Sequence, residues 1–273
     1  MIFKQLTTAF ILFFCLIQAK AQLGYSPLGA RSSGMGNASV TNIDVWAAHQ
    51  NQAAAVFMDR AEVSTAYQSP FLMKELATVS AAAAVPFEKS ALTTSISQFG
   101  YSQYSETRAG VGYGLKLSKR LALGVRFNYF NVNFQDNFYG SKGTVTAEIS
   151  MLAKVTDNFI MGAHLYNPTY NKIAEFESDR IPVILRVGGT YLFSDRFFAN
   201  LEVEKNIDHN ANIKLGAEYN VQEKFFIRGG INTAPFSNSF GFGVLIKGLR
   251  IDIASQYHYI LGYSPQATLG YRF

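Results

Sequence analysis

The stretch that decides the fold is Leu121-Ala122-Leu123-Gly124-Val125-Arg126-Phe127-Asn128-Tyr129. Every second side chain is large and apolar, and the side chains between them are Ala, Gly, Arg and Asn. A period of two places these sets on opposite faces of a β-strand, whereas a helix would mix them. Apolar and aromatic side chains opposite a polar face predict the wall of a transmembrane β-barrel, with lipid outside and a polar lumen inside.

The same alternation recurs from about residue 60 to residue 273. Residues 145–154, 213–219 and 249–254 repeat it clearly. Counting such segments predicts an antiparallel barrel of about fourteen strands, with twelve as the open alternative. The predicted strands begin near Arg60, Leu76, Ser90, Thr107, Leu121, Thr144, Phe159, Ile181, Phe197, Asn212, Lys224, Ser239, Leu249 and Gln266.

The connections between these segments alternate in length. Short polar turns are expected at 88–89, 118–120, 156–158, 194–196, 222–224 and 247–248. Longer connections are expected near 69–75, 102–107, 135–143, 167–180, 208–211, 235–239 and 261–266. Bacterial outer-membrane barrels have short periplasmic turns and longer outer loops. The pattern therefore predicts an outer-membrane protein of a Gram-negative bacterium with both termini in the periplasm.

Composition supports a barrel over a soluble protein. Charged residues make up only 16% of the chain, and there are 23 Phe and 15 Tyr against one Trp. A soluble β-sandwich would also alternate, but it gives no reason for aromatic side chains opposite a charged row in so many strands. The sandwich also leaves the alternation of short and long connections unexplained.

Residues 1–21 have the features of a secretory signal peptide. Lys4 precedes an apolar stretch that is too short to span a membrane, and Ala19-Lys20-Ala21 fits a cleavage site. Cleavage would remove the only cysteine, Cys15, so the mature chain has no disulfide and no thiolate metal site. Its net charge is 22 basic minus 19 acidic residues, or +3. This mild, dispersed charge argues against nucleic acid as a partner.

The C-terminal stretch 267–273 places Ala, Leu, Tyr and Phe on one face and ends in an aromatic residue. Tyr271 and Phe273 resemble the signal by which the barrel-assembly machinery recognises outer-membrane proteins during biogenesis.

The polar face of the strands is expected to line the lumen. It could form mutually neutralising pairs that hold the barrel and an internal plug together, which we favour, or a polar path for a solute. The predicted lumen-lining residues are Arg126, Glu148, Lys154, Arg186, Glu202, Glu204, Lys214, Glu218, Arg228, Arg250 and Asp252.

Residues 22–59 differ from the rest and predict a plug segment. This segment is rich in Gly and Ser and then in Ala, and small residues let backbones pack closely. It resembles the N-terminal signature of PorV/PorQ-type proteins in the FadL-like group, where G-A-R-x-x-G-M-G precedes W-N-P-A. Gln52 stands where that signature has Pro, and the chain is short for these families. The matching residues are Gly29, Ala30, Arg31, Gly34, Met35, Gly36, Trp46 and Asn51.

No pattern in the sequence points to catalysis, a metal or a cofactor. Gly34-Met35-Gly36 lacks the third glycine of a dinucleotide-binding loop, and no strand precedes it. The four histidines lie far apart without metal-ligand spacing. We therefore expect a protein that is not an enzyme.

Two functions remain. The resemblance implies a role in type IX protein secretion or surface assembly, with secretion proteins as partners. The alternative is a FadL-like transporter of hydrophobic small molecules, with such a molecule as ligand. In both cases outer-membrane lipid surrounds the barrel.

Overall fold

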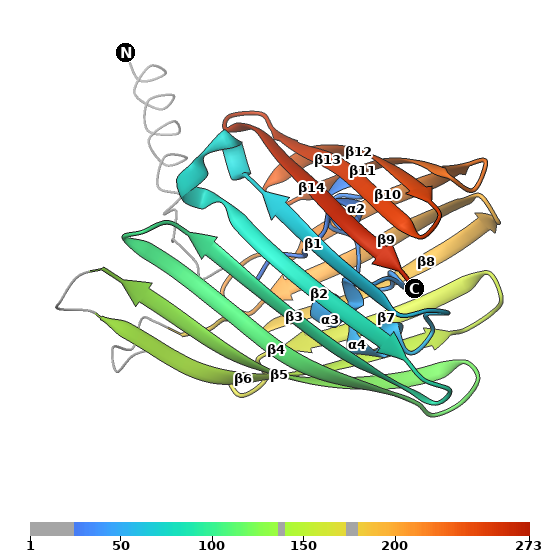
Figure 1. The fold of residues 1–273 in the computed structure, drawn as a ribbon, viewed down its shortest axis with the longest axis horizontal. Coiled ribbons are helices and arrows are strands. Elements are labelled where there is room, and N and C mark those ends of the chain that lie inside the picture. The colour runs from blue at the N-terminus through green and yellow to red at the C-terminus, as the bar shows by residue number, and fades with distance from the viewer. Residues whose placement is uncertain (1–24, 136–139, 173–179) are drawn as a thin grey trace, which may run out of the picture.

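Within residues 25–135, 140–172 and 180–273, which the computed structural model describes, fourteen antiparallel strands form one closed barrel (Figure 1). Each strand pairs with its neighbours in sequence, and β14 returns to pair with β1. The prediction of a fourteen-strand transmembrane barrel is confirmed. The predicted signal peptide lies outside the described residues. The strands are β1 (Glu62–Gln68), β2 (Thr78–Pro86), β3 (Ser90–Gly100), β4 (Tyr104–Lys116), β5 (Leu121–Phe134), β6 (Ser141–Lys154), β7 (Phe159–Tyr166), β8 (Ile184–Ser194), β9 (Phe197–Asn206), β10 (Asn212–Val221), β11 (Phe225–Thr233), β12 (Phe236–Ile246), β13 (Leu249–His258) and β14 (Gly262–Arg272).

The two faces of the wall have the predicted chemistry. On β5, Val125 and Phe127 are 45% and 63% exposed, whereas Arg126 and Asn128 between them are each 1% exposed. Outward-facing apolar side chains recur in this way on every strand. An apolar outer surface of this extent is stable only against lipid, so the outer face is the membrane contact and the lumen is the buried core.

The six predicted short turns all lie at the end of the barrel where β1 begins and β14 ends. At the opposite end, the connections 69–77, 135–140, 167–183 and 207–211 are longer. The first of these contains two short 3-10 helices, η1 (Pro70–Leu72) and η2 (Lys74–Leu76).

Three predicted long connections are wrong, because strand pairing continues to tight turns at 101–103, 234–235 and 259–261. Gly100 and Gly262 adopt φ values of 99° and 86°, which few other residues tolerate, and so permit two of these reversals. In the third, the backbone amides of Thr233 and Ala234 donate to the Asn212 side chain at 3.0 and 2.9 Å.

From residue 25 onward, three short helices precede the barrel: α2 (Ala30–Gly34), α3 (Ala47–Gln50) and α4 (Gln52–Ala55). No helix in the described part of the chain has both the length and the apolar character needed to cross a membrane. The helices lie inside the ring of strands (Figure 1), where α2 contacts β11 to β14 and α4 contacts β2 to β6. The apolar core of the molecule is therefore formed between this N-terminal segment and the small inward side chains of the wall. Its members include Trp46, Ala47, Ala53, Ala54, Val56, Ala82, Ala84, Ala91, Ala122 and Leu152.

Candidate functional site

The lumen is shaped to receive the backbone of the N-terminal segment. A Cβ atom on Gly124 would lie 2.6 Å from the Ala53 amide nitrogen, and one on Gly114 would lie 2.6 Å from the Gln52 carbonyl oxygen. Gly216 and Gly230 leave no room for a side chain either, because the Met35 backbone fills that space. Glycine is required at these inward positions by the close approach of a second backbone.

The signature glycines of the segment have packing roles of the same kind. Gly29, at φ 91°, lies against the indole of Trp46, and a Cβ there would come within 2.5 Å of the ring. Gly34 approaches the backbone of Gly241 on β12, and Gly36, at φ 64°, approaches Ile231 on β11. The signature is therefore explained by the fit of this segment within the barrel.

A first ion-pair cluster joins the segment to β10, β11 and β13. Arg31 donates to both Glu218 carboxylate oxygens at 2.8 and 2.9 Å and to Asp44 at 3.1 Å. Arg228 donates to Glu218 at 2.6 Å and contacts Asp252 at 2.7 Å. Arg250 donates to the other Asp252 oxygen at 2.8 Å. These three arginines face three carboxylates, so the cluster is neutral as well as buried.

A second cluster lies on β8, β9 and β10. Arg186 donates to both oxygens of Glu202 at 2.8 and 3.0 Å. Lys214 donates to Glu202 at 3.1 Å and to Glu204 at 2.7 Å. The backbone amides of Ser39 and Val40 also donate to Glu202, at 2.7 and 2.8 Å. A wall carboxylate thus satisfies backbone groups of the N-terminal segment that would otherwise be buried without partners.

A third network lies on β5, β6 and β7. Glu148 accepts from His164 Nε2 at 2.9 Å and from the Asn128 amide at 2.8 Å. Gln52 donates to the same carboxylate at 3.3 Å. Arg126 donates to the Ala48 carbonyl oxygen and, at 2.7 Å, to Ser95 on β3. The residue that departs from the family signature, Gln52, is therefore part of the buried network.

The structure distributes the predicted lumen residues among these networks, with one exception. The ammonium group of Lys154 lies 4.5 Å from the centroid of the Phe57 ring. Tyr271 and Phe273 form an edge contact, with ring centroids 5.1 Å apart, and both are exposed. Within the described ranges, no three His, Cys, Asp or Glu side chains are grouped to hold a metal ion.

Sequence reasoning did not single out Tyr25 or Arg108 as lumen residues, and it treated His49 and His164 only as non-ligands. All four are buried in the lumen. Strand periodicity could have found Arg108, because it shares an inward face with Gly110 and Gly112. Nothing in the local sequence could have found Tyr25, which depends on how the N-terminal segment folds back.

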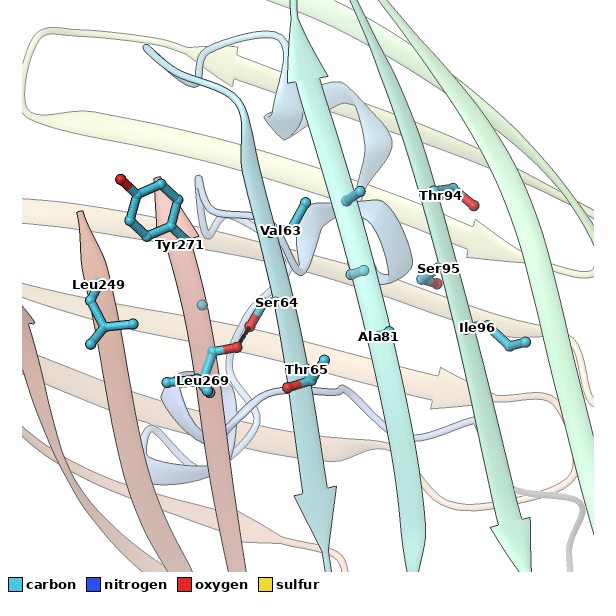
Figure 2. Close-up of a pocket in the computed structure, with 13 residues that line it drawn as sticks. Val63, Ser64, Thr65, Ala81, Thr94, Ser95, Ile96, Leu249, Leu269 and Tyr271 are labelled. Atoms are coloured by element: carbon cyan, nitrogen blue, oxygen red, sulfur yellow. Dashed lines mark hydrogen bonds between the residues drawn. The ribbon is translucent and has the colours of Figure 1, made fainter. Parts of the chain in front are cut away.

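The outer wall carries a groove of about 480 Å³ that spans β13, β14, β1, β2 and β3. Figure 2 shows how Thr65, Ala81 and Thr94, which are small or short, leave the strand backbones uncovered between larger side chains. Ser64 donates to the Leu269 carbonyl oxygen at 3.1 Å across the β1–β14 seam (Figure 2). The lining residues are Val63, Ser64, Thr65, Ala81, Ala82, Ala83, Thr94, Ser95, Ile96, Leu249, Leu269, Gly270 and Tyr271.

The wall is thin behind this groove. The inward side chains there include Ser64, Ala82 and Ser95, and helix α3 contacts β2 and β3 from the lumen side. Apolar surface thus faces lipid on one side of the strands, and the N-terminal segment lies directly on the other side.

No family model and no curated protein matches the chain. Among solved structures, it is similar to the toluene transporter TbuX of Ralstonia pickettii, with a TM-score of 0.68 and 13% identity over 92% of this chain and 98% of the other. It is also similar to the toluene transporter TodX of Pseudomonas putida, with a TM-score of 0.67 and 10% identity over 92% of this chain and 98% of the other. A Pseudomonas aeruginosa FadL homologue has a TM-score of 0.63 and 12% identity over 93% of this chain and 99% of the other. The chain therefore has the fold of the FadL-type outer-membrane barrels.

Proposed function

We propose that the protein is a non-enzymatic outer-membrane channel that passes hydrophobic small molecules, in the manner of FadL-type transporters. The observation that carries the proposal is the apolar groove over a thin wall, with the N-terminal segment directly behind it. A groove of about 480 Å³ is within the range of small-molecule sites. The structural likeness to toluene transporters supports this function better than a PorV/PorQ role in secretion.

The filled lumen supports the same proposal. Three polar networks tie the segment to the wall around most of the barrel. A water-filled pore for polar solutes would need these neutral, interlocked networks to open. A hydrophobic solute that reaches the wall groove has a path in which little charged surface must be exposed.

Uptake by cells tests the proposal. A strain that lacks the protein should take up toluene more slowly, and the native gene should restore the rate. Ala81→Trp fills the groove and should reduce uptake, whereas Ala217→Trp on the outer face of β10 is a matched control that should leave uptake unchanged. Equal uptake by the two variants at equal membrane levels would rule out the groove as part of the route.

The same knockout separates the two candidate functions. A secretion role requires that specific exported proteins accumulate in the periplasm while toluene uptake stays normal. Loss of uptake with a normal set of secreted proteins supports the channel.

We also propose that the short turns and both termini face the periplasm, as in bacterial barrels generally. Cysteine labelling tests this orientation. A membrane-impermeant maleimide should label Lys119→Cys, in the 117–120 turn, only after the outer membrane is permeabilised. The C-terminal Tyr271 and Phe273 would then lie where the assembly machinery acts, and loss of Phe273 should lower the yield of folded protein in the membrane.

A further inference from the structure

The Tyr25 side chain is enclosed by aromatic rings in the lumen. It stacks on His49 of α3, with ring centroids 4.8 Å apart and an interplanar angle of 8°. His164 and Tyr166 of β7 lie beside it, with centroids at 5.6 and 4.9 Å. This cage, formed by His49, His164, Tyr166, Arg108 and Arg186, holds one aromatic ring.

Two guanidinium groups complete the cage. The Cζ atoms of Arg108 and Arg186 each lie 5.7 Å from the Tyr25 ring centroid. Arg186 is neutralised by Glu202, but no described carboxylate lies within 4.0 Å of Arg108. Its Nε atom is buried without a hydrogen-bond partner. The charge of Arg108 is thus compensated by ring faces, which are those of Tyr25, Phe130 and Tyr166.

The cage also holds the hydroxyl group of Tyr25 by hydrogen bonds. The Tyr25 hydroxyl donates to the His49 carbonyl oxygen at 2.8 Å and accepts from Arg186 Nη1 at 3.3 Å. Burial raises the pKa of the Tyr25 phenol above its usual range, so the group is neutral. Burial also lowers the pKa of His49, and its Nε2 donates to the Ser26 carbonyl oxygen at 3.1 Å. The ring stacked on Tyr25 is therefore a neutral imidazole.

The stretch that carries Tyr25 is held by side-chain contacts rather than by secondary structure. Residues 25–28 form no helix or strand. Two of these contacts come from α3: His49 bonds to the Ser26 carbonyl oxygen, and the Gln50 amide donates to the Leu28 carbonyl oxygen at 2.6 Å. Tyr25 is also only four residues beyond the cleavage site that the sequence predicts after Ala21. Displacing the ring from the cage therefore breaks side-chain contacts but no hydrogen bond of a helix or strand ladder.

We propose that this cage is a binding site for neutral phenolic molecules, and that Tyr25 occupies it when no such solute is present. The inference rests on the proposed function, because it names a class of solute for the channel. A phenol satisfies the same carbonyl oxygen, guanidinium and ring faces as Tyr25. A saturated ring of equal size gives up the contacts between Arg108 and an aromatic face. Toluene gives up the hydroxyl and leaves buried polar groups unpaired.

Binding of p-cresol to the purified, detergent-solubilised full chain tests the proposal by calorimetry. Tyr25→Ala should bind p-cresol at least ~tenfold more tightly than the native chain, which must first expel its own ring, and at least ~fivefold more tightly than 4-methylcyclohexanol. Arg108→Met in the Tyr25→Ala background should remove most of that preference for the aromatic ring. Tyr25→Phe keeps the cage filled and should bind no more tightly than about the native level. Equal binding of p-cresol by native and Tyr25→Ala protein, both folded, would overturn the proposal.

A second measurement avoids the substitutions. Saturating p-cresol added to the native chain should increase hydrogen–deuterium exchange at residues 25–28 and leave α3 protected. Unchanged exchange at residues 25–28 with p-cresol bound elsewhere would also overturn it. If p-cresol does not bind but the protein still supports toluene uptake, only the proposal of a cage site fails. If toluene uptake does not depend on the protein, the proposed channel function fails, whatever the cage binds.

Discussion

Two adjacent glycines on β11 offer a sharp test of how the N-terminal segment is held. Gly230 points inward, and a Cβ there would lie within 3.0 Å of both Met35 and Gly36. Gly229 points outward, and a Cβ there would meet nothing within 4 Å. Neither glycine has a positive φ, so alanine fits the strand backbone at both positions.

Gly230→Ala should weaken the docking of the segment by about 1–3 kcal/mol, the usual cost of overpacking a filled core. At ~1.4 kcal/mol per tenfold, the undocked population rises by roughly 5- to 150-fold. Gly229→Ala should be neutral or slightly stabilising, since glycine in a strand interior costs ~0.5–1 kcal/mol relative to alanine.

Hydrogen–deuterium exchange of residues 29–55 in the folded barrel measures this difference. Trypsin cleavage after Arg31, whose side chain is only 13% exposed, gives an independent readout. Both rates should rise in Gly230→Ala and stay native in Gly229→Ala. If the two variants exchange at the same rate, the close packing of the segment against β11 is not what holds it.

Three further perturbations follow from the contacts. Val125→Arg should destabilise the barrel by about 2–4 kcal/mol if the site lies near the bilayer midplane. Asn131→Arg lies on the same face but nearer the rim, and it should destabilise the barrel by only about 0–1 kcal/mol. Folding titrations into lipid measure both free energies. Arg31→Met should cost about 3 kcal/mol by leaving Glu218 one cation short, and adding Glu218→Gln should recover part of it in the same titration. Burial lowers the pKa of His49, so the unfolded chain binds this proton more readily than the folded chain. The free energy of unfolding should therefore fall as pH drops below ~6.5, and His49→Gln should flatten that dependence.

Strand periodicity was sufficient to predict the wall. The predicted starts at Ser90, Leu121, Phe159, Phe197 and Asn212 coincide with those of the structure, because inside–outside alternation is a local property of the chain. Polar strand ends are harder to recognise, since beyond the lipid both faces can be polar. The predicted starts near Ser239 and Gln266 are therefore late, and β12 and β14 begin at Phe236 and Gly262.

The lumen could be predicted in composition but not in pairing. Alternation identified Glu218 as an inward residue, but its partner Arg31 lies 187 positions earlier in the chain. That pairing depends on where the N-terminal segment lies relative to β10, and no local sequence pattern encodes this position. The same holds for Gln52, whose bond to Glu148 gives a physical role to a departure from the family signature.

The interlocking of the N-terminal segment with glycines from β4 to β12 also constrains the order of assembly. A closed barrel has no edge through which a folded chain can later be inserted. Three buried ion networks and backbone-to-backbone contacts would have to be desolvated and fitted one after another if the segment threaded in from an open end. It is simpler for the segment, which is synthesised first, to lie against the growing sheet while successive hairpins pair and close around it. Joining β14 to β1 then becomes the step that seals it in, and a damaged segment should appear first as slow closure of the seam.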